Sequence, residues 1–174
     1  MSQFQAPRYP FAMIFGDTLY PPAPPSSYYI FTDDFVGGWT NSGTNANAQS
    51  LSTVQVASGS YSLFNDIGAW ANINFKSGSW GTEVLLLPST YTAVSFSVYM
   101  SGSTSNISLY LETVGGSRTG SSQTFTCTAN TWEQKSVAIS TICPNSEMFC
   151  TVGFQEFSGV GIQFFIDDLK LTYA

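Results

Sequence analysis

The sequence predicts an all-β fold: an antiparallel two-sheet β-sandwich of the jelly-roll type, preceded by an extended N-terminal arm. Short segments that alternate apolar and polar residues recur from residue 28 to residue 174. Clusters of Gly, Ser and Asn separate these segments, as they do at turns between strands. No stretch has the apolar period of a helix, so two packed sheets are the architecture that buries so many half-apolar strands.

Two segments, 92–100 and 106–112, show the alternation most clearly. Their apolar sides, which we expect to face the space between the sheets, consist of Val94, Phe96, Val98, Ile107, Leu109 and Leu111. The Ser-rich loop between the segments predicts a hairpin that pairs them, so that their polar sides share one face. The other predicted strands are the opening segment from residue 28 and 51–56, 60–64, 69–75, 83–87, 123–127, 132–139, 150–156 and 162–172.

Residues 1–27 form a separate arm before the sandwich domain of residues 28–174. The run PPAPP at 21–25 disfavours both helix and sheet and favours an extended path. The arm's large apolar side chains are Phe4, Tyr9, Phe11, Met13, Ile14, Phe15, Leu19 and Tyr20. A flexible spacer lacks such groups, so we expect the arm to contact neighbouring protein subunits; contact with its own domain and a disordered tail are the alternatives.

Composition excludes several classes of function. Five Lys and Arg against eleven Asp and Glu give a net charge of -6, which disfavours nucleic-acid binding. The chain has no histidine, which excludes a Ser-His-Asp group, and it has no closely spaced acidic cluster for glycoside hydrolysis, so we expect no enzyme. No apolar run is long enough to span a membrane, and the N-terminus has no recognisable signal peptide. Whether Cys143 and Cys150 are bridged stays open.

Two pairs of aspartates lie within apolar segments. Asp33 and Asp34 end the opening strand, and Asp167 and Asp168 interrupt the last one. First and last strands are often neighbours in antiparallel sandwiches, which would bring the four carboxylates together. Because so few Lys and Arg are available to neutralise them, the sequence predicts a structural calcium ion. In the alternative interpretation, one aspartate of each pair faces water.

The order of several short motifs resembles a known family. These motifs are YYIFTDDFVGGW, VASGSYSL, AWANINF, YTAVSFSVYM, TWEQKSVAI and FFIDDLKLTY. Together they are similar to the jelly-roll carbohydrate-binding modules of bacterial polysaccharide-degrading enzymes, over residues 28–174. The resemblance implies a structural calcium between the first and last strands. It places Asp34 and Asp168 first among the ligands, with Ser58 or Ser60 as further oxygen donors.

Modules of this kind bind sugars by stacking aromatic rings on pyranose faces beside polar groups. The candidate carbohydrate-binding residues are Tyr99, Tyr110, Glu112, Trp70 and Trp80. We expect Trp39 and Trp132 to pack in the core or at its rim, and a structural role stays the alternative for every tryptophan.

The sequence therefore predicts a non-catalytic carbohydrate-binding-type jelly roll that serves as a structural or surface component of a larger assembly. A virus particle and an extracellular fibre are the assemblies that we expect, which places the protein in a virion or at an extracellular surface. Neighbouring subunits would be its partners, with glycans as a second class. A free-standing lectin-like module of a polysaccharide-targeting system is the alternative.

Overall fold

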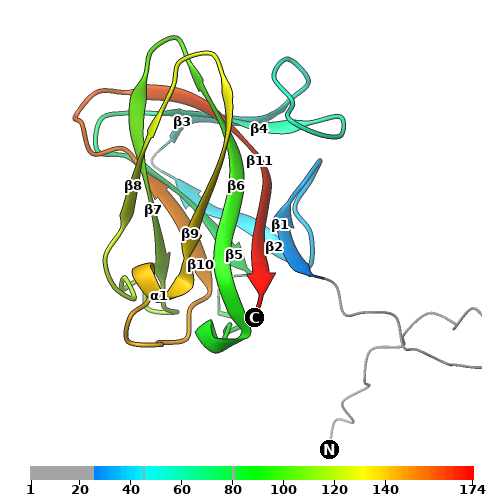
Figure 1. Ribbon diagram of the computed structural model, residues 1–174, viewed down its shortest axis with the longest axis vertical. Helices are drawn as coiled ribbons and strands as arrows, with labels where there is room; N and C mark the ends of the chain where they lie inside the picture. Colours follow the sequence, from blue (N-terminus) through cyan, green and yellow to red (C-terminus); the bar gives the residue numbers. More distant parts are fainter. Residues whose placement is uncertain (1–25, 45, 80) are drawn as a thin grey trace, which may run out of the picture.

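The computed structural model describes residues 26–44, 46–79 and 81–174, and in them eleven strands form two antiparallel sheets packed face to face (Figure 1). The all-β sandwich predicted from the sequence is thereby confirmed. The predicted arm lies outside the described residues, apart from its last two positions.

The six-stranded sheet has the order β3-β4-β11-β6-β9, and β1 also pairs with β11. Its strands are β1 (Ser27–Phe31), β3 (Ala46–Ser52), β4 (Ser62–Ile67), β6 (Tyr91–Ser101), β9 (Trp132–Ala138) and β11 (Ile162–Tyr173). The pairing of β1 with β11 confirms that the first and last strands are neighbours.

The five-stranded sheet has the order β2-β5-β10-β7-β8. Its strands are β2 (Trp39–Thr44), β5 (Asn72–Ser77), β10 (Thr151–Gln155), β7 (Ser105–Glu112) and β8 (Gln123–Cys127). Two short helical turns, η1 (Pro88–Thr90) and α1 (Ile139–Ile142), lie in the connections. Among the described residues, no helix has the length and apolar character of a transmembrane span.

The core lies between the two sheets. The six side chains that the alternation assigned to it are at most 2% exposed, which confirms that prediction. Phe154 of β10 lies in the middle of the core, with its ring centroid 4.9 Å from that of Phe96 on the opposite sheet and 6.0 Å from that of Phe75 beside it. Trp39 is also buried, as expected, at 2% exposure.

The predicted hairpin of β6 and β7 is wrong. β6 pairs with β9 and β11, whereas β7 pairs with β8 and β10, so the connection at residues 102–104 crosses from one sheet to the other. Both strands still bury their apolar sides, because they lie on opposite sides of the same core. The alternation therefore identified the buried side of each strand but not its partner.

Two further predicted strands do not form as expected. Of 51–56 only the first two residues belong to a strand; Val54 is 80% exposed, and the chain from residue 53 to residue 61 is a loop. Of 83–87 only Leu86 forms an isolated bridge, with Phe149. Strand β2 was missed because its sequence, WTNSGT, has no apolar alternation. The three cysteines are buried and free, so Cys143 and Cys150 are not bridged.

Substitution of Phe154 tests the contact between the sheets. Because this side chain is fully buried and contacts rings of both sheets, we predict that Phe154→Ala lowers the free energy of unfolding by about 3–5 kcal/mol. Urea denaturation measures the change, with the exposed Val54→Ala as a control that should stay within about 0.5 kcal/mol of the wild type. A loss below about 1 kcal/mol would contradict this role for Phe154.

Candidate functional site

A gap along one edge of β11 is closed by a loop. On this edge β4 pairs with β11 as far as Ile166 and β1 pairs from Leu169, while β6 occupies the other edge. Asp167 lies in the gap and is fully buried. Its Oδ2 accepts hydrogen bonds from the backbone N–H groups of Ala57 and Ser58, both at 3.0 Å. Burial raises the pKa of Asp167, and these hydrogen bonds oppose that rise by stabilising the carboxylate.

The other end of the same loop is held by Asp33. Its Oδ1 accepts hydrogen bonds from the N–H groups of Ser60 (2.5 Å) and Tyr61 (2.7 Å), which lower the pKa of this carboxyl group. Gly59 allows this approach: a Cβ at that position would lie 2.4 Å from the Asp33 Oδ1, and φ is +68°. Asp34 is exposed and accepts the N–H of Phe35.

Asp33 and Asp167 are therefore held by opposite ends of one short segment, 57–61, through backbone N–H donors. In the part of the chain that the structure describes, no three Asp, Glu, Cys or His side chains converge as metal ligands. The aspartates thus fit a hydrogen-bonded arrangement better than a four-carboxylate calcium site. Calcium binding here stays a prediction, which melting curves with calcium and with a chelator would test.

Gly59→Ala tests the N–H donors directly. The added methyl group would clash with Asp33 and separate it from Ser60 and Tyr61, so we predict a loss of about 2–4 kcal/mol of unfolding free energy. Gly102→Ala is the matched control, because Gly102 also has a positive φ (+84°). At this position an added Cβ would have no atom within 4 Å and so would meet no clash. It should cost only about 1 kcal/mol. Equal losses for the two variants would contradict the account of Asp33.

The outer side of the five-stranded sheet carries a group of amide and guanidinium side chains around one buried ring. We call this surface the amide face and define it by Asn72, Asn74, Tyr110, Arg118 and Gln155. The Tyr110 hydroxyl donates to Asn74 Oδ1 (2.7 Å) and accepts from Asn72 Nδ2 (2.8 Å). The Arg118 guanidinium lies 4.1 Å from the centroid of the Tyr110 ring. Arg118 also donates to Gln155 Oε1, which joins three strands and a loop in one polar network.

Tyr110 lies flat across β10 because position 153 is a glycine. A Cβ at Gly153 would be 2.3 Å from the Tyr110 Cζ, so no other residue leaves room for the ring. With the strand on one side and Arg118 on the other, Tyr110 is only 1% exposed. Burial raises its pKa, so the hydroxyl is neutral and able to donate at neutral pH. Glu112, the next outward residue of β7, is half-buried, and burial raises its pKa as well.

Trp70 lies at one end of the amide face and is 60% exposed. Its backbone has a left-handed conformation (φ +61°), which is rare for any residue other than glycine. Its N–H donates to Glu156 Oε2 (3.1 Å), and its carbonyl accepts from Gln155 Nε2 (3.1 Å). The backbone of an exposed ring is thus fixed from two sides, next to the polar network.

Glu156 holds Trp70 from inside the protein. Its side chain is fully buried and also accepts hydrogen bonds from the N–H groups of Ser158 and Gly159 (3.1 Å for Gly159). Burial raises the pKa of Glu156, but the hydrogen bonds from Ser158, Trp70 and Gly159 together lower it by more than burial raises it. The net shift of the pKa is therefore downward. The residue is therefore a carboxylate at neutral pH.

The sequence-predicted binding residues do not form one group. Tyr99 lies on the outer side of the six-stranded sheet, with its ring centroid 5.6 Å from that of Trp132, whereas Tyr110 and Glu112 lie on the amide face. The expectation that Tyr99 and Tyr110 share a face is wrong, because β6 and β7 belong to different sheets. Trp80 lies outside the described residues. Sequence reasoning missed Asn72, Asn74, Gln155 and Arg118; the NIN alternation of residues 72–74 is the one signal that pointed to the first two.

Comparison with known proteins gives the fold. No protein-family model matches the chain, and no curated protein is a significant match in sequence. A mutant of the family 29 carbohydrate-binding module CBM29-2, solved with cellulohexaose, has a TM-score of 0.59 at 12% identity, over 84% of this chain and 89% of that one. The chain shares the β-sandwich fold of these carbohydrate-binding modules.

Two further structures agree. The family 11 carbohydrate-binding module of the cellulosomal cellulase Lic26A-Cel5E of Clostridium thermocellum has a TM-score of 0.57 at 11% identity, over 85% of this chain and 95% of the module. Another CBM29-2 mutant, solved with mannohexaose, has a TM-score of 0.53 at 13% identity, over 84% of this chain and 92% of that one. At such identities the likeness to carbohydrate-binding modules establishes the fold alone.

Substitution of Glu156 tests how Trp70 is held. Glu156→Gln keeps the size of the side chain but replaces one acceptor oxygen with an amide donor that faces N–H groups. A carboxylate with a lowered pKa stabilises the fold above its unfolded pKa, near 4.5, and this stabilisation is lost as the pH falls through the lower folded pKa. We predict that stability falls less steeply below pH 4.5 in the variant than in the wild type. Identical pH profiles in urea denaturation would contradict this role of Glu156.

Proposed function

We propose that the chain is a non-catalytic carbohydrate-binding module and that the amide face binds an oligosaccharide. The observation that carries the proposal is the exposed Trp70, whose backbone carbonyl accepts a hydrogen bond from Gln155, while Gln155 accepts one from Arg118. An indole ring covers the C–H side of a pyranose, and neighbouring amide and guanidinium groups exchange hydrogen bonds with its hydroxyls. The complexes of similar modules with cellulohexaose and mannohexaose support this class of ligand.

Tyr110 has a supporting role in this proposal. Its ring is covered, so it does not stack on a sugar, but it presents a flat surface on which Arg118 rests. The hydrogen bonds from Asn72 and to Asn74 hold the ring in place. A guanidinium group that is already oriented loses little conformational entropy when it binds a hydroxyl-rich ligand.

The affinity expected for this surface is low. The surface is open, and one exposed indole supplies the stacking contact, so dissociation constants from about high micromolar to millimolar are the expectation. The sugar itself stays open, and cellulohexaose and mannohexaose are suitable first probes because similar modules were solved in complex with them.

The assembly role expected from the sequence has less support. It depended on the arm, residues 1–27, of which nearly all lie outside the described residues. The similar structures are carbohydrate-binding modules, which favours the lectin-like module that the sequence left as the alternative. A role in a virus particle or fibre, and a virion or extracellular location, stay predictions.

Two variants test the amide face. Because Trp70 supplies the stacking surface and Arg118 the hydrogen-bond donors, we predict that Trp70→Ala and Arg118→Ala each weaken binding of the preferred hexasaccharide at this face at least tenfold, about 1.4 kcal/mol. NMR titration of amides near residues 72–74 and 153–155 measures this binding separately from any other site. Tyr61→Ala, which removes an exposed ring outside this face, is the matched control and should bind like the wild type. Unchanged affinity in both variants would refute the proposal.

A further inference from the structure

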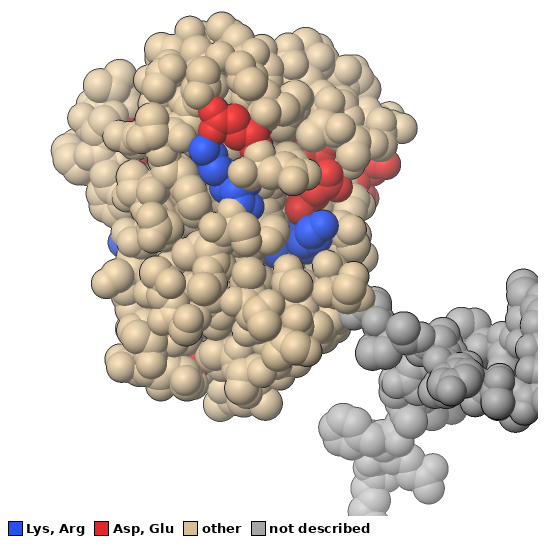
Figure 2. Space-filling model, viewed as in Figure 1, with Lys and Arg blue, Asp and Glu red and all other residues tan. Residues whose placement is uncertain are grey.

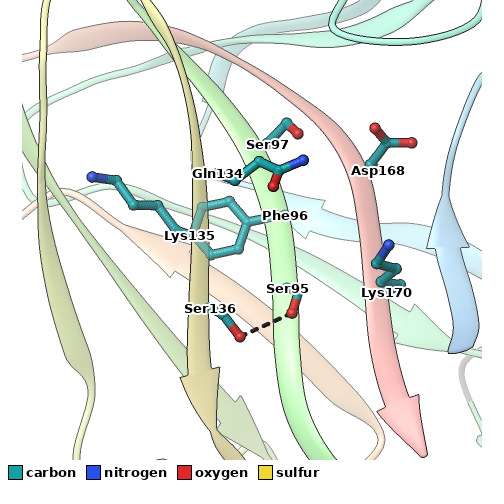
Figure 3. A pocket seen from close by; sticks show the side chains of 8 residues that line it. All are labelled: Ser95, Phe96, Ser97, Gln134, Lys135, Ser136, Asp168 and Lys170. Carbon is teal, nitrogen blue, oxygen red and sulfur yellow. Dashed lines mark hydrogen bonds between the residues drawn. The ribbon is translucent and has the colours of Figure 1, made fainter.

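The outer side of the six-stranded sheet, opposite the amide face, has a trough over strands β9, β6 and β11 (Figure 3). The outward-facing residues of the middle strand are the small Ser95 and Ser97, with the buried Phe96 between them, whereas the flanking strands supply the longer Gln134 and Lys170. The hollow measures about 430 Å³. A second hollow of about 240 Å³ adjoins it and reaches Trp132.

An irregularity in β11 forms one wall of the trough. The register passes from Asp167 opposite Ser97 to Lys170 opposite Ser95, so β11 has one residue more than β6 over this stretch. Asp168 occupies this bulge in a left-handed conformation (φ +50°), and its Oδ1 accepts a hydrogen bond from the Ser58 hydroxyl at 2.8 Å. Bulges re-aim side chains, and strained non-glycine residues gather at binding sites.

The lining of the trough is polar and balanced in charge. Figure 2 shows basic and acidic atoms next to one another on this side of a surface that otherwise carries few charges. In the trough itself Lys170 is offset by Asp168, whereas the ammonium group of Lys135 points away from the trough (Figure 3). Lys135 also pairs with Glu133, and it donates to the Thr126 carbonyl at 3.0 Å. The balance favours a neutral ligand over an anion or a cation.

Hydroxyl, amide, carboxylate and ammonium groups line the trough, so it presents both donors and acceptors. The Ser95 and Ser136 hydroxyls lie 2.9 Å apart and bond to each other across two strands. A ligand with many hydroxyl groups can match such a set, because each hydroxyl both donates and accepts.

Aromatic rings border the trough at one end. Trp132, Tyr99, Phe165 and Phe64 lie side by side on four neighbouring strands, with ring centroids between 5.1 and 5.9 Å apart. Of these, Trp132 lines the smaller hollow and is partly exposed. It offers a flat apolar surface next to Gln134, which is the combination that suits the two sides of a sugar ring.

We propose that this trough is a second binding site, specific for a neutral oligosaccharide. The sugar hydroxyls bond to Ser97, Gln134 and Asp168, while one pyranose ring packs against Trp132. The proposal goes beyond the proposed function, because the two sites lie on opposite sheets and the protein then binds two separate saccharide chains at once. Such a protein links neighbouring chains instead of only attaching to one.

NMR titration of the isotope-labelled full chain with cellulohexaose, and separately with mannohexaose, tests the trough. With at least one of these probes, the amide signals of residues 95–97, 132–136 and 168–170 are expected to shift and to saturate. The amide signals near Asn72, Asn74 and Gln155 report on the opposite face in the same spectra. Absence of saturable shifts around the trough with both probes, up to about 10 mM, would overturn the proposal even if the amide face binds.

Two variants separate the sites. Ser95→Tyr fills the trough from an outward-facing position of β6 and should weaken binding there at least tenfold, while the amide face binds as before. Arg118→Ala should have the opposite effect. If Ser95→Tyr does not fold, Gln134→Ala, at an exposed edge position, takes its place. Binding at the trough that is weakened by neither Ser95→Tyr nor Gln134→Ala would refute this site. Shifts of amide signals at the trough without any at the amide face would support the site and refute the proposed function.

Discussion

The packing of the two sheets against one apolar layer is the constraint on which the rest of the structure depends. It buries alternate residues of β6 and β7 from opposite sides, with Phe154 in contact with rings of both sheets. The intervening residues must then point outward, away from each other. Ser95, Ser97 and Tyr99 therefore reach one surface and Tyr110 and Glu112 the other, which is why the protein has two separate polar faces.

Backbone N–H groups take the place of cations in stabilising the buried carboxylates. The chain has only five Lys and Arg for eleven Asp and Glu, yet Asp167 and Glu156 are fully buried. Each accepts hydrogen bonds from backbone N–H groups of loops. Trp70, one of the donors to Glu156, has a positive φ, and Ser58, one of the donors to Asp167, also bonds through its hydroxyl to Asp168, which has a positive φ as well. Glu156 holds Trp70 beside the amide face, and the residue next to Asp167 is Asp168, a wall of the trough. The same interaction thus defines both candidate sites.

Much of the fold was predictable from the sequence, because burial imposes a two-residue period that the side chains display directly. The pairing of strands was not, since β6 and β7 satisfy that period equally well as neighbours or as members of opposite sheets. That Asp33 and Asp167 lie on the same side of the fold, where both hold the segment 57–61, was predictable from the neighbouring first and last strands. Their N–H partners were not, because every residue except proline carries that donor and the sequence does not mark it. Arg118 lies in a loop, where no periodicity predicts which way a side chain points.

The resemblance to carbohydrate-binding modules and the geometry of the amide face rest on different observations. The first concerns the course of the backbone, and the second concerns particular side chains such as Trp70 and Arg118, which the comparison at 11 to 13% identity does not address. A crystal structure of the protein with a bound hexasaccharide tests the link between them most directly. The account predicts a sugar ring against the Trp70 indole, with hydroxyls bonded to Arg118 or Gln155. A bound saccharide that leaves the amide face empty would contradict it.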